Sequence, residues 1–147
     1  MRKHIVAGNW KMNTTVAEGV ELAKAVVAAS AEVPADVKLI IAPPFTHLYP
    51  VAEVVKGSAV GLSAQNCADK VKGAYTGEVA VNMLSGVGCE YVILGHSEKE
   101  STTVRLTLSL SRRLSSLLLR VLLQSSASAR RRKSVRLAVI SRLLPSR

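Results

Sequence analysis

Polar side chains that could act on a small substrate directly follow several short apolar runs in this sequence. They are Asn9 and Lys11, then Gln65 and Asn66, then His96, Ser97 and Glu98. A lysine cation can hold a negatively charged group, and an imidazole can polarise a carbonyl group. Lys11 and His96 therefore predict a site for an anionic substrate that carries a carbonyl.

Each of these side chains also has a structural interpretation. A lysine at the start of a loop is usually a solvated surface charge, and a histidine near a glycine is more often structural. Gln65 and Asn66 could simply satisfy the backbone groups of a loop. Spacing alone does not decide between the two interpretations.

Apolar runs of strand length alternate with segments of helical spacing over the first 94 residues. The predicted strands are residues 4–7, 37–42, 59–64 and 91–94, and the predicted helices are residues 16–29, 48–55 and 79–85. The strands are almost continuously apolar, which predicts a buried, parallel sheet covered by helices. No G-x-G-x-x-G follows the first strand, which argues against dinucleotide binding. Periodicity leaves a doubly wound sheet and a (β/α)₈ barrel both open, and in both the carboxyl ends of the strands carry the site.

Charge divides the chain into two parts near residue 100. Residues 1–100 hold 9 basic and 10 acidic residues, whereas residues 101–147 hold 11 basic and no acidic residues. Arg, Leu and Ser fill 33 of those last 47 positions, which include no glycine and no aromatic residue. We therefore predict a globular part over residues 1–99 and an aberrant, non-native or poorly ordered basic tail over residues 100–147.

The cysteines and the lengths of the apolar runs indicate in which cellular compartment the protein is expected. Cys67 and Cys89 make no disulfide framework, which suits a reducing compartment. The apolar run near the N-terminus is too short for a signal peptide. No uninterrupted apolar run approaches the ~18–20 residues of a membrane span. We expect a cytoplasmic protein.

Five motifs of the first part resemble the triosephosphate isomerases. They are Gly-Asn-Trp-Lys-Met-Asn at residues 8–13, Ala-Pro-Pro-Phe at 42–45, Ala-Gln-Asn at 64–66, Gly-Ala-Tyr-Thr-Gly-Glu at 73–78 and Tyr-Val-Ile-Leu-Gly-His-Ser-Glu at 91–98. The resemblance implies a homodimeric (β/α)₈ barrel that interconverts dihydroxyacetone phosphate and glyceraldehyde 3-phosphate, in glycolysis and gluconeogenesis, without a cofactor or a metal. Residues 1–99 would supply about four βα units of this barrel.

The resemblance also implies roles around the reacting carbonyl. Asn9 and Lys11 resemble the substrate-binding pair, and Lys11 would place positive charge beside the phosphate and the developing enediolate. His96 resembles the electrophile that polarises the carbonyl. Ser97 and Glu98 resemble residues that surround this electrophile.

Two further roles concern a second subunit. Gln65 resembles a dimer-interface residue. Residues 67–78 resemble a loop that inserts into the partner subunit, with Thr76 near its tip. The resemblance therefore implies that these residues contact a second copy of the chain.

The family pattern stops after Lys99. The catalytic glutamate of the family lies in a motif like Ala-Tyr-Glu-Pro-Val-Trp, which is absent here, and no Asp or Glu follows Glu100. The phosphate-binding loops after strands six to eight are also missing. One nucleotide lost from the gene just after codon 99 would explain the change. Residues 117–129 can be back-translated with chosen codons and read again with that nucleotide restored. The result is Ala-Pro-Ala-Gly-Leu-Thr-Pro-Ile-Val-Cys-Val-Gly-Glu, which resembles the family's fifth strand. We therefore predict a frameshifted tail, no catalytic base and no isomerase activity.

Half a barrel has consequences for stability and for partners. Without later strands, residues 4–7 and 91–94 would both expose unpaired backbone groups, which predicts low stability. The basic run at residues 130–133 and the leucines at helical spacing before it could bind nucleic acid or an acidic membrane non-specifically. No aromatic residue of the tail can stack on bases. We expect neither a specific nucleic-acid partner nor a membrane partner, and favour a non-functional product of a shifted frame.

Overall fold

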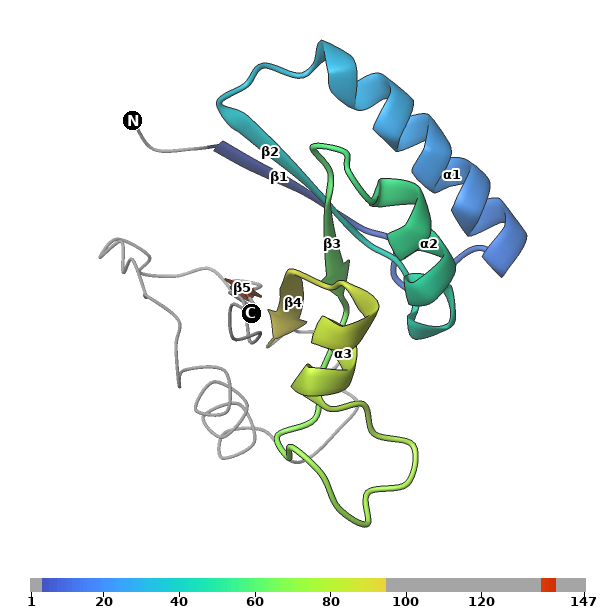
Figure 1. Cartoon of the computed structure of the whole chain (residues 1–147), viewed down its shortest axis with the longest axis vertical. Coiled ribbons are helices and arrows are strands. Elements are labelled where there is room, and N and C mark those ends of the chain that lie inside the picture. The colour runs from blue at the N-terminus through green and yellow to red at the C-terminus, as the bar shows by residue number, and fades with distance from the viewer. Residues whose placement is uncertain (1–3, 95–135, 140–147) are drawn as a thin grey trace.

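The computed structural model describes residues 4–94 and 136–139. The strands are β1 His4–Asn9, β2 Val37–Ala42, β3 Gly61–Ala64, β4 Tyr91–Leu94 and β5 Arg136–Val139. The helices are α1 Val16–Ala29, α2 Leu48–Val55 and α3 Val81–Val87, with short 3-10 turns η1 Ser30–Glu32 and η2 Phe45–His47. The three α-helices lie along the same face of the sheet (Figure 1).

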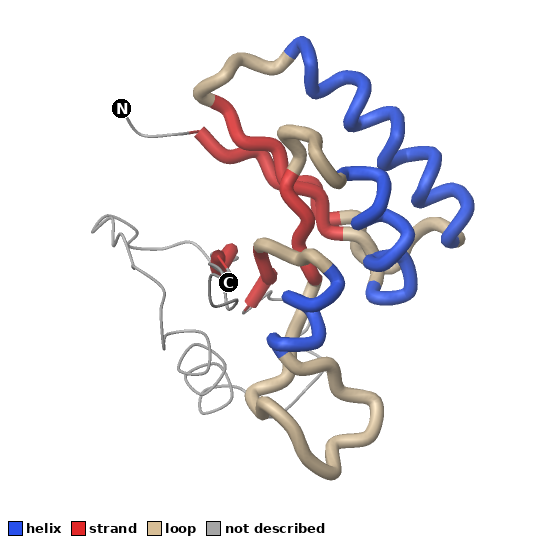
Figure 2. Tube along the Cα trace, in the orientation of Figure 1, coloured by secondary structure: helices blue, strands red, loops and turns tan. Residues whose placement is uncertain are grey.

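The order and curvature of the strands distinguish the two folds that the sequence left open. The described strands form one sheet in the order β1-β2-β3-β4-β5, and β1 to β4 are parallel. A doubly wound sheet would instead reverse its order at a switch point. The strands also change direction progressively from β1 to β4, so that the sheet curls (Figure 2). The predicted parallel sheet covered by helices is confirmed, and the fold is an incomplete (β/α)₈ barrel.

Local signals explain where α1 begins. Thr15 caps the helix: its side chain accepts a hydrogen bond from the Glu18 backbone N–H, and the Glu18 carboxylate accepts one from the Thr15 N–H at 2.7 Å. This reciprocal pair satisfies two backbone donors that a helix end leaves open. None of the helices within the described residues is long and apolar enough to cross a membrane.

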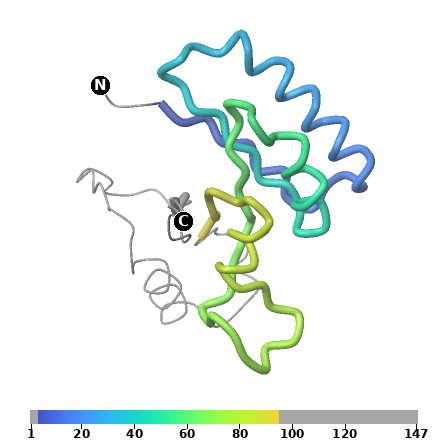
Figure 3. The backbone as a smooth tube through the Cα atoms, in the orientation of Figure 1, coloured from blue at the N-terminus to red at the C-terminus, as the bar shows by residue number. Residues whose placement is uncertain are grey.

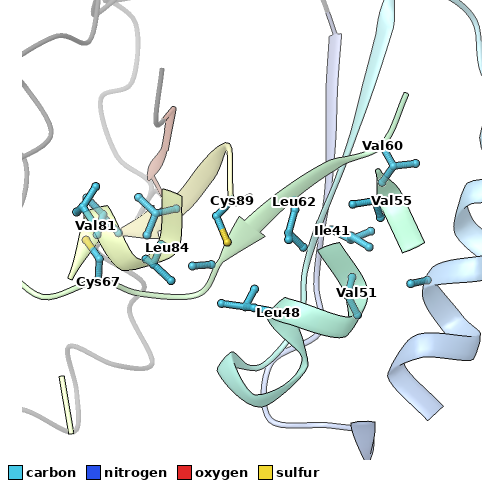
Figure 4. Close-up of a cluster of buried hydrophobic side chains, with 14 residues drawn as sticks. Ile41, Leu48, Val51, Val55, Val60, Leu62, Cys67, Val81, Leu84 and Cys89 are labelled. Carbon is cyan, nitrogen blue, oxygen red and sulfur yellow. The ribbon is translucent and has the colours of Figure 1, made fainter. Parts of the chain in front are cut away.

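The hydrophobic core lies between the sheet and the helices. Strand residues of alternate positions point into it, because successive side chains of a strand face opposite sides of the sheet. Figure 4 shows strand residues Ile41 and Leu62 facing Leu48 and Val51 of α2. Further core residues come from α3 and the segments beside it: Val81, Leu84, Cys67 and Cys89. This packing fixes β2 and β3 relative to α2.

The prediction that the first strand is buried is wrong. Residues 4–8 of β1 are exposed, including Ile5 at 54% and Val6 at 56%. β1 pairs with β2 over its whole length, from His4 opposite Val37 to Asn9 opposite Ala42. Within the described residues no strand covers its other side, so an apolar sequence suited to a barrel interior stays open to water.

The prediction that the fourth strand leaves an unpaired edge is also wrong. β5 pairs with β4 in antiparallel orientation, with Tyr91 opposite Val139 and Leu94 opposite Arg136. The edge of a sheet offers backbone donors and acceptors to any extended segment that reaches it. A segment of the basic tail therefore occupies the place beside β4, and its antiparallel direction differs from that of every other pair in the sheet.

Candidate active site

The structure places the predicted site residues in three groups. Asn9 ends β1 and Lys11 follows it, while Gln65 and Asn66 follow β3. Thr76 lies in the loop between β3 and α3. The residues expected at and around the electrophile lie outside the described residues: His96, Ser97 and Glu98.

The first two groups meet at the carboxyl ends of β1, β2 and β3. The Gln65 side-chain amide donates to the Lys11 carbonyl oxygen at 2.8 Å and to the Ala42 carbonyl oxygen at 2.8 Å. Both hydrogens of one amide group are thereby used. Gln65 was expected at a dimer interface, and within this chain it satisfies loop backbone groups, which is the structural interpretation that the sequence left open.

Asn9 fixes the other side of Lys11. The Lys11 backbone N–H donates to the Asn9 side-chain oxygen at 3.0 Å. Trp10, between them, donates its backbone N–H to the Ala42 carbonyl oxygen at 3.1 Å. Lys11 is thus held at its N–H by Asn9 and at its C=O by Gln65, and it lies on an exposed stretch of chain.

The segment from Trp10 to Thr14 has an unusual backbone. Lys11 has a φ of 55° and Thr14 a φ of 71°, in the left-handed region that residues other than glycine rarely adopt. Such a conformation costs about 1–3 kcal/mol per residue and persists when surrounding contacts fix it. The segment after β1 that carries Lys11 therefore has a backbone conformation that its surroundings must hold.

One residue near this segment has no counterpart in the sequence predictions. His47, at the end of η2, is 3% exposed, and its Nε2 lies 3.2 Å from the Thr14 carbonyl oxygen. His47 follows Pro43-Pro44 and directly precedes α2, and no pattern of neighbouring residues indicates such a contact. Its partner is 33 residues away in the sequence.

The loop that carries Thr76 extends away from α1 and α2 (Figure 3). The Ala68 N–H donates to the Val79 carbonyl oxygen at 2.8 Å and closes the base of the loop. Residues 71–78 are all exposed, including the apolar side chains of Val71 and Tyr75. Gly73 has a φ of +137°, and a Cβ there would lie 2.8 Å from the Tyr75 ring. The loop therefore has a definite shape with apolar groups at its surface.

The arrangement can bind an anion at the carboxyl edge of a parallel sheet. A lysine ammonium is a compact point charge that suits a phosphate group. The carboxyl ends of barrel strands are also where (β/α)₈ enzymes carry their active sites. Fold and site together define the N-terminal portion of a (β/α)₈ barrel with a lysine after the carboxyl end of its first strand.

Comparison with known proteins gives the family. The family model for triosephosphate isomerase matches residues 4–118. Triosephosphate isomerases of Phocaeicola vulgatus and Bacteroides fragilis are each 52% identical over 101 residues, which is 69% of this chain and 40% of each relative. That of Chlorobium phaeovibrioides is 54% identical over 99 residues, 67% of this chain and 40% of the relative. The chain belongs to the triosephosphate isomerase family.

The extent of these matches differs at the C-terminal side. The chain spans about two fifths of the length of the curated relatives it matches. The family match runs to residue 118, past Lys99, whereas the pairwise matches cover 99 to 101 residues. The division of the chain at Lys99 remains a prediction.

Proposed function

We propose that residues 1–99 form the substrate-binding portion of a triosephosphate isomerase, for dihydroxyacetone phosphate and glyceraldehyde 3-phosphate. Family membership supports this substrate class. The observation that carries the proposal is the Lys11 segment, held by Asn9 and Gln65 at the carboxyl edge of the sheet. In this proposal Lys11 lies beside the phosphate and the developing enediolate, and Asn9 shares the binding of substrate.

His96 takes the part of the electrophile in this proposal. A neutral imidazole that donates a hydrogen bond to the substrate carbonyl stabilises the negative charge that develops there. In this proposal Ser97 and Glu98 have the supporting roles that the resemblance to the family implies. The interconversion also needs a base to remove a proton from carbon, and a positioned general base typically contributes ~10²–10⁴-fold.

In this proposal residues 101–147 supply no such general base. Residues 101–147 contain no Asp or Glu, and the family's glutamate motif does not occur. We infer that the loss of one nucleotide after codon 99 of the gene replaced the later part of the barrel by a basic tail. The chain then binds the substrate and does not turn it over, as a non-functional product of an isomerase gene. Sequencing the gene across codons 99–101 tests the cause: an intact frame on both strands contradicts the frameshift.

Association with a second copy follows the same resemblance. Met12, next to Lys11, is 96% exposed, and the loop with Thr76 carries the exposed apolar residues Val71 and Tyr75. A contiguous exposed apolar surface can mark a protein–protein interface. We propose that these surfaces meet in a homodimer, in the cytoplasm, where the substrate is an intermediate of glycolysis and gluconeogenesis.

Substrate binding is measured by calorimetric titration of the 147-residue chain with dihydroxyacetone phosphate. We expect saturable binding that is lost in Lys11→Met. Lys24→Met is the matched control, because Lys24 lies on the exposed side of α1 and pairs with Glu21 at 2.7 Å. Equal affinity in both variants contradicts the role of Lys11.

A further inference from the structure

The segment of residues 10–14, which carries Lys11 between β1 and α1, depends on contacts from elsewhere in the fold. Both Lys11 and Thr14 have a positive φ. A backbone of this kind keeps its shape when its surroundings determine it. The direction in which the segment presents Lys11 therefore depends on how each of its ends is held.

His47 holds the end at Thr14. Its Nε2 lies 3.2 Å from the Thr14 carbonyl oxygen and 3.2 Å from the Thr14 Oγ1. The Thr14 hydroxyl donates its own proton to the Asn13 carbonyl oxygen. A carbonyl oxygen only accepts hydrogen bonds. Both contacts therefore require the proton of the imidazole to be on Nε2.

The second ring nitrogen fits the same tautomer. Thr46 Oγ1 lies 2.8 Å from Nδ1 of His47, and a hydroxyl can donate to an unprotonated ring nitrogen. The neutral ring with its proton on Nε2 thus has a partner at each nitrogen. Such pairing is what a polar group as buried as His47 needs.

The ring is fixed in place by α1. His47 packs against Gly19, where a Cβ would lie 2.4 Å from His47 Cδ2. The cap of α1, Thr15, directly follows Thr14. The imidazole therefore contacts α1 and also binds the residue that leads into it, so η2, α1 and the Lys11 segment form one unit.

We propose that His47 is a positioning residue for Lys11. Its Nε2–H fixes Thr14, while Gln65 fixes the Lys11 carbonyl at the other end of the segment. The consequence for substrate binding rests on the proposed function, but the contact and its tautomer do not. The structure thus assigns a role to His47, a buried residue of the second βα unit: it orients the segment that carries Lys11 in the first unit.

The tautomer is measured by nitrogen-15 NMR of the 147-residue chain labelled on histidine. We expect a protonated Nε2 and an unprotonated Nδ1 for His47 at neutral pH. Thr46→Val removes the donor to Nδ1 at nearly constant volume, and we expect it to lower the share of this tautomer. A His47 ring protonated on Nδ1 instead overturns the proposal.

The effect on Lys11 is measured with two substitutions of His47. His47→Phe keeps a ring and removes both nitrogens, whereas His47→Gln keeps an N–H donor of similar reach. We expect His47→Phe to shift the amide resonances of Lys11 and Thr15 and to weaken binding of dihydroxyacetone phosphate roughly three- to tenfold, the loss expected for one neutral hydrogen bond. We expect His47→Gln to restore most of the affinity.

Two outcomes separate this proposal from the proposed function. Unchanged Lys11 and Thr15 resonances in His47→Phe overturn the positioning role, even if the substrate still binds. If the unsubstituted chain does not bind dihydroxyacetone phosphate, the proposed function fails, and the tautomer and the resonance shifts still decide the role of His47. Gly19→Ala, which displaces the ring and keeps every donor, takes the place of His47→Phe if that variant does not fold.

Discussion

The side-chain nitrogen of Gln65 lies 2.8 Å from the backbone carbonyl oxygen of Lys11, although 54 residues separate them in the sequence. The same nitrogen lies 2.8 Å from the Ala42 carbonyl oxygen. One amide group thus ties together the chain segments that follow β1, β2 and β3. This tie holds the backbone of an exposed lysine beside the carboxyl ends of a parallel sheet.

Replacement of Gln65 tests this tie. Gln65→Met removes both donors at similar volume: the Lys11 carbonyl oxygen loses this donor, and the Ala42 carbonyl oxygen keeps the one from the Trp10 backbone N–H, so we expect a loss of about 1–3 kcal/mol in the free energy of unfolding. Gln65→Glu keeps the shape and turns donors into acceptors facing carbonyl oxygens, and we expect at least as large a loss. Urea denaturation measures both. A tolerated Gln65→Glu would show that shape, not donation, is what matters.

Substitutions of two adjacent threonines, Thr14 and Thr15, should change the free energy of unfolding in opposite directions. Thr14 has a φ of 71°, a conformation that glycine adopts at little cost, so Thr14→Gly should stabilise the fold by about 0.5–1 kcal/mol. Thr15 caps α1, so Thr15→Ala should destabilise it by about 1 kcal/mol. Thermal unfolding of the two variants gives the comparison. A destabilised Thr14→Gly would mean that its hydroxyl contacts outweigh the backbone cost.

Two helical glycines form a second matched pair. Replacing a helical glycine by alanine normally stabilises a helix by about 1 kcal/mol. Gly86 in α3 has no atom within 4 Å of an added Cβ, so Gly86→Ala should show this gain. Gly19→Ala should instead destabilise the chain, because the added Cβ would lie 2.4 Å from the His47 ring. Equal stabilisation by both, in urea denaturation, would contradict the packing of His47 on α1.

Stability should fall at alkaline pH through Cys89. Burial raises the pKa of the Cys89 thiol to about 12, whereas an exposed thiol ionises near ~8.5. The unfolded chain therefore releases this proton first, so the contribution is complete below about pH 8.5 and is lost as the pH rises toward the folded pKa. Unfolding midpoints in urea between neutral pH and about pH 10 measure the decline. Cys89→Ala should flatten it, and an equal decline in that variant would assign it to other groups.

Local signals predicted several elements with the bounds that the structure has. The expected bounds 16–29, 37–42, 48–55 and 91–94 are those of α1, β2, α2 and β4, and in the structure Thr15 and Glu18 form the cap of α1 while Pro43-Pro44 directly follow β2. Boundaries without such signals shifted: the strand expected at residues 59–64 is Gly61–Ala64, and the helix expected at 79–85 is Val81–Val87. Capping and proline chemistry act within a few residues, which is why they can be recognised in a sequence.

Features that depend on distant neighbours could not be predicted in the same way. The apolar sequence of β1 suits burial, but burial depends on a strand on its other side. The pairing of β5 with β4 joins residues more than 40 positions apart, in a direction that no local pattern indicates. The contacts of Gln65 and His47 likewise join separate βα units. The place of Asn9, Lys11 and Gln65 after their strands could therefore be predicted, whereas the contacts that hold the Lys11 backbone could not; the roles of these residues in a site stay a prediction.

A coupled assay of triose phosphate interconversion tests the central claim most directly. It compares the 147-residue chain with the product of the same gene after one base is restored after codon 99. We predict no turnover by the 147-residue chain, and turnover by the restored product that His96→Gln abolishes. Turnover by the 147-residue chain itself, abolished by His96→Gln, would contradict the account.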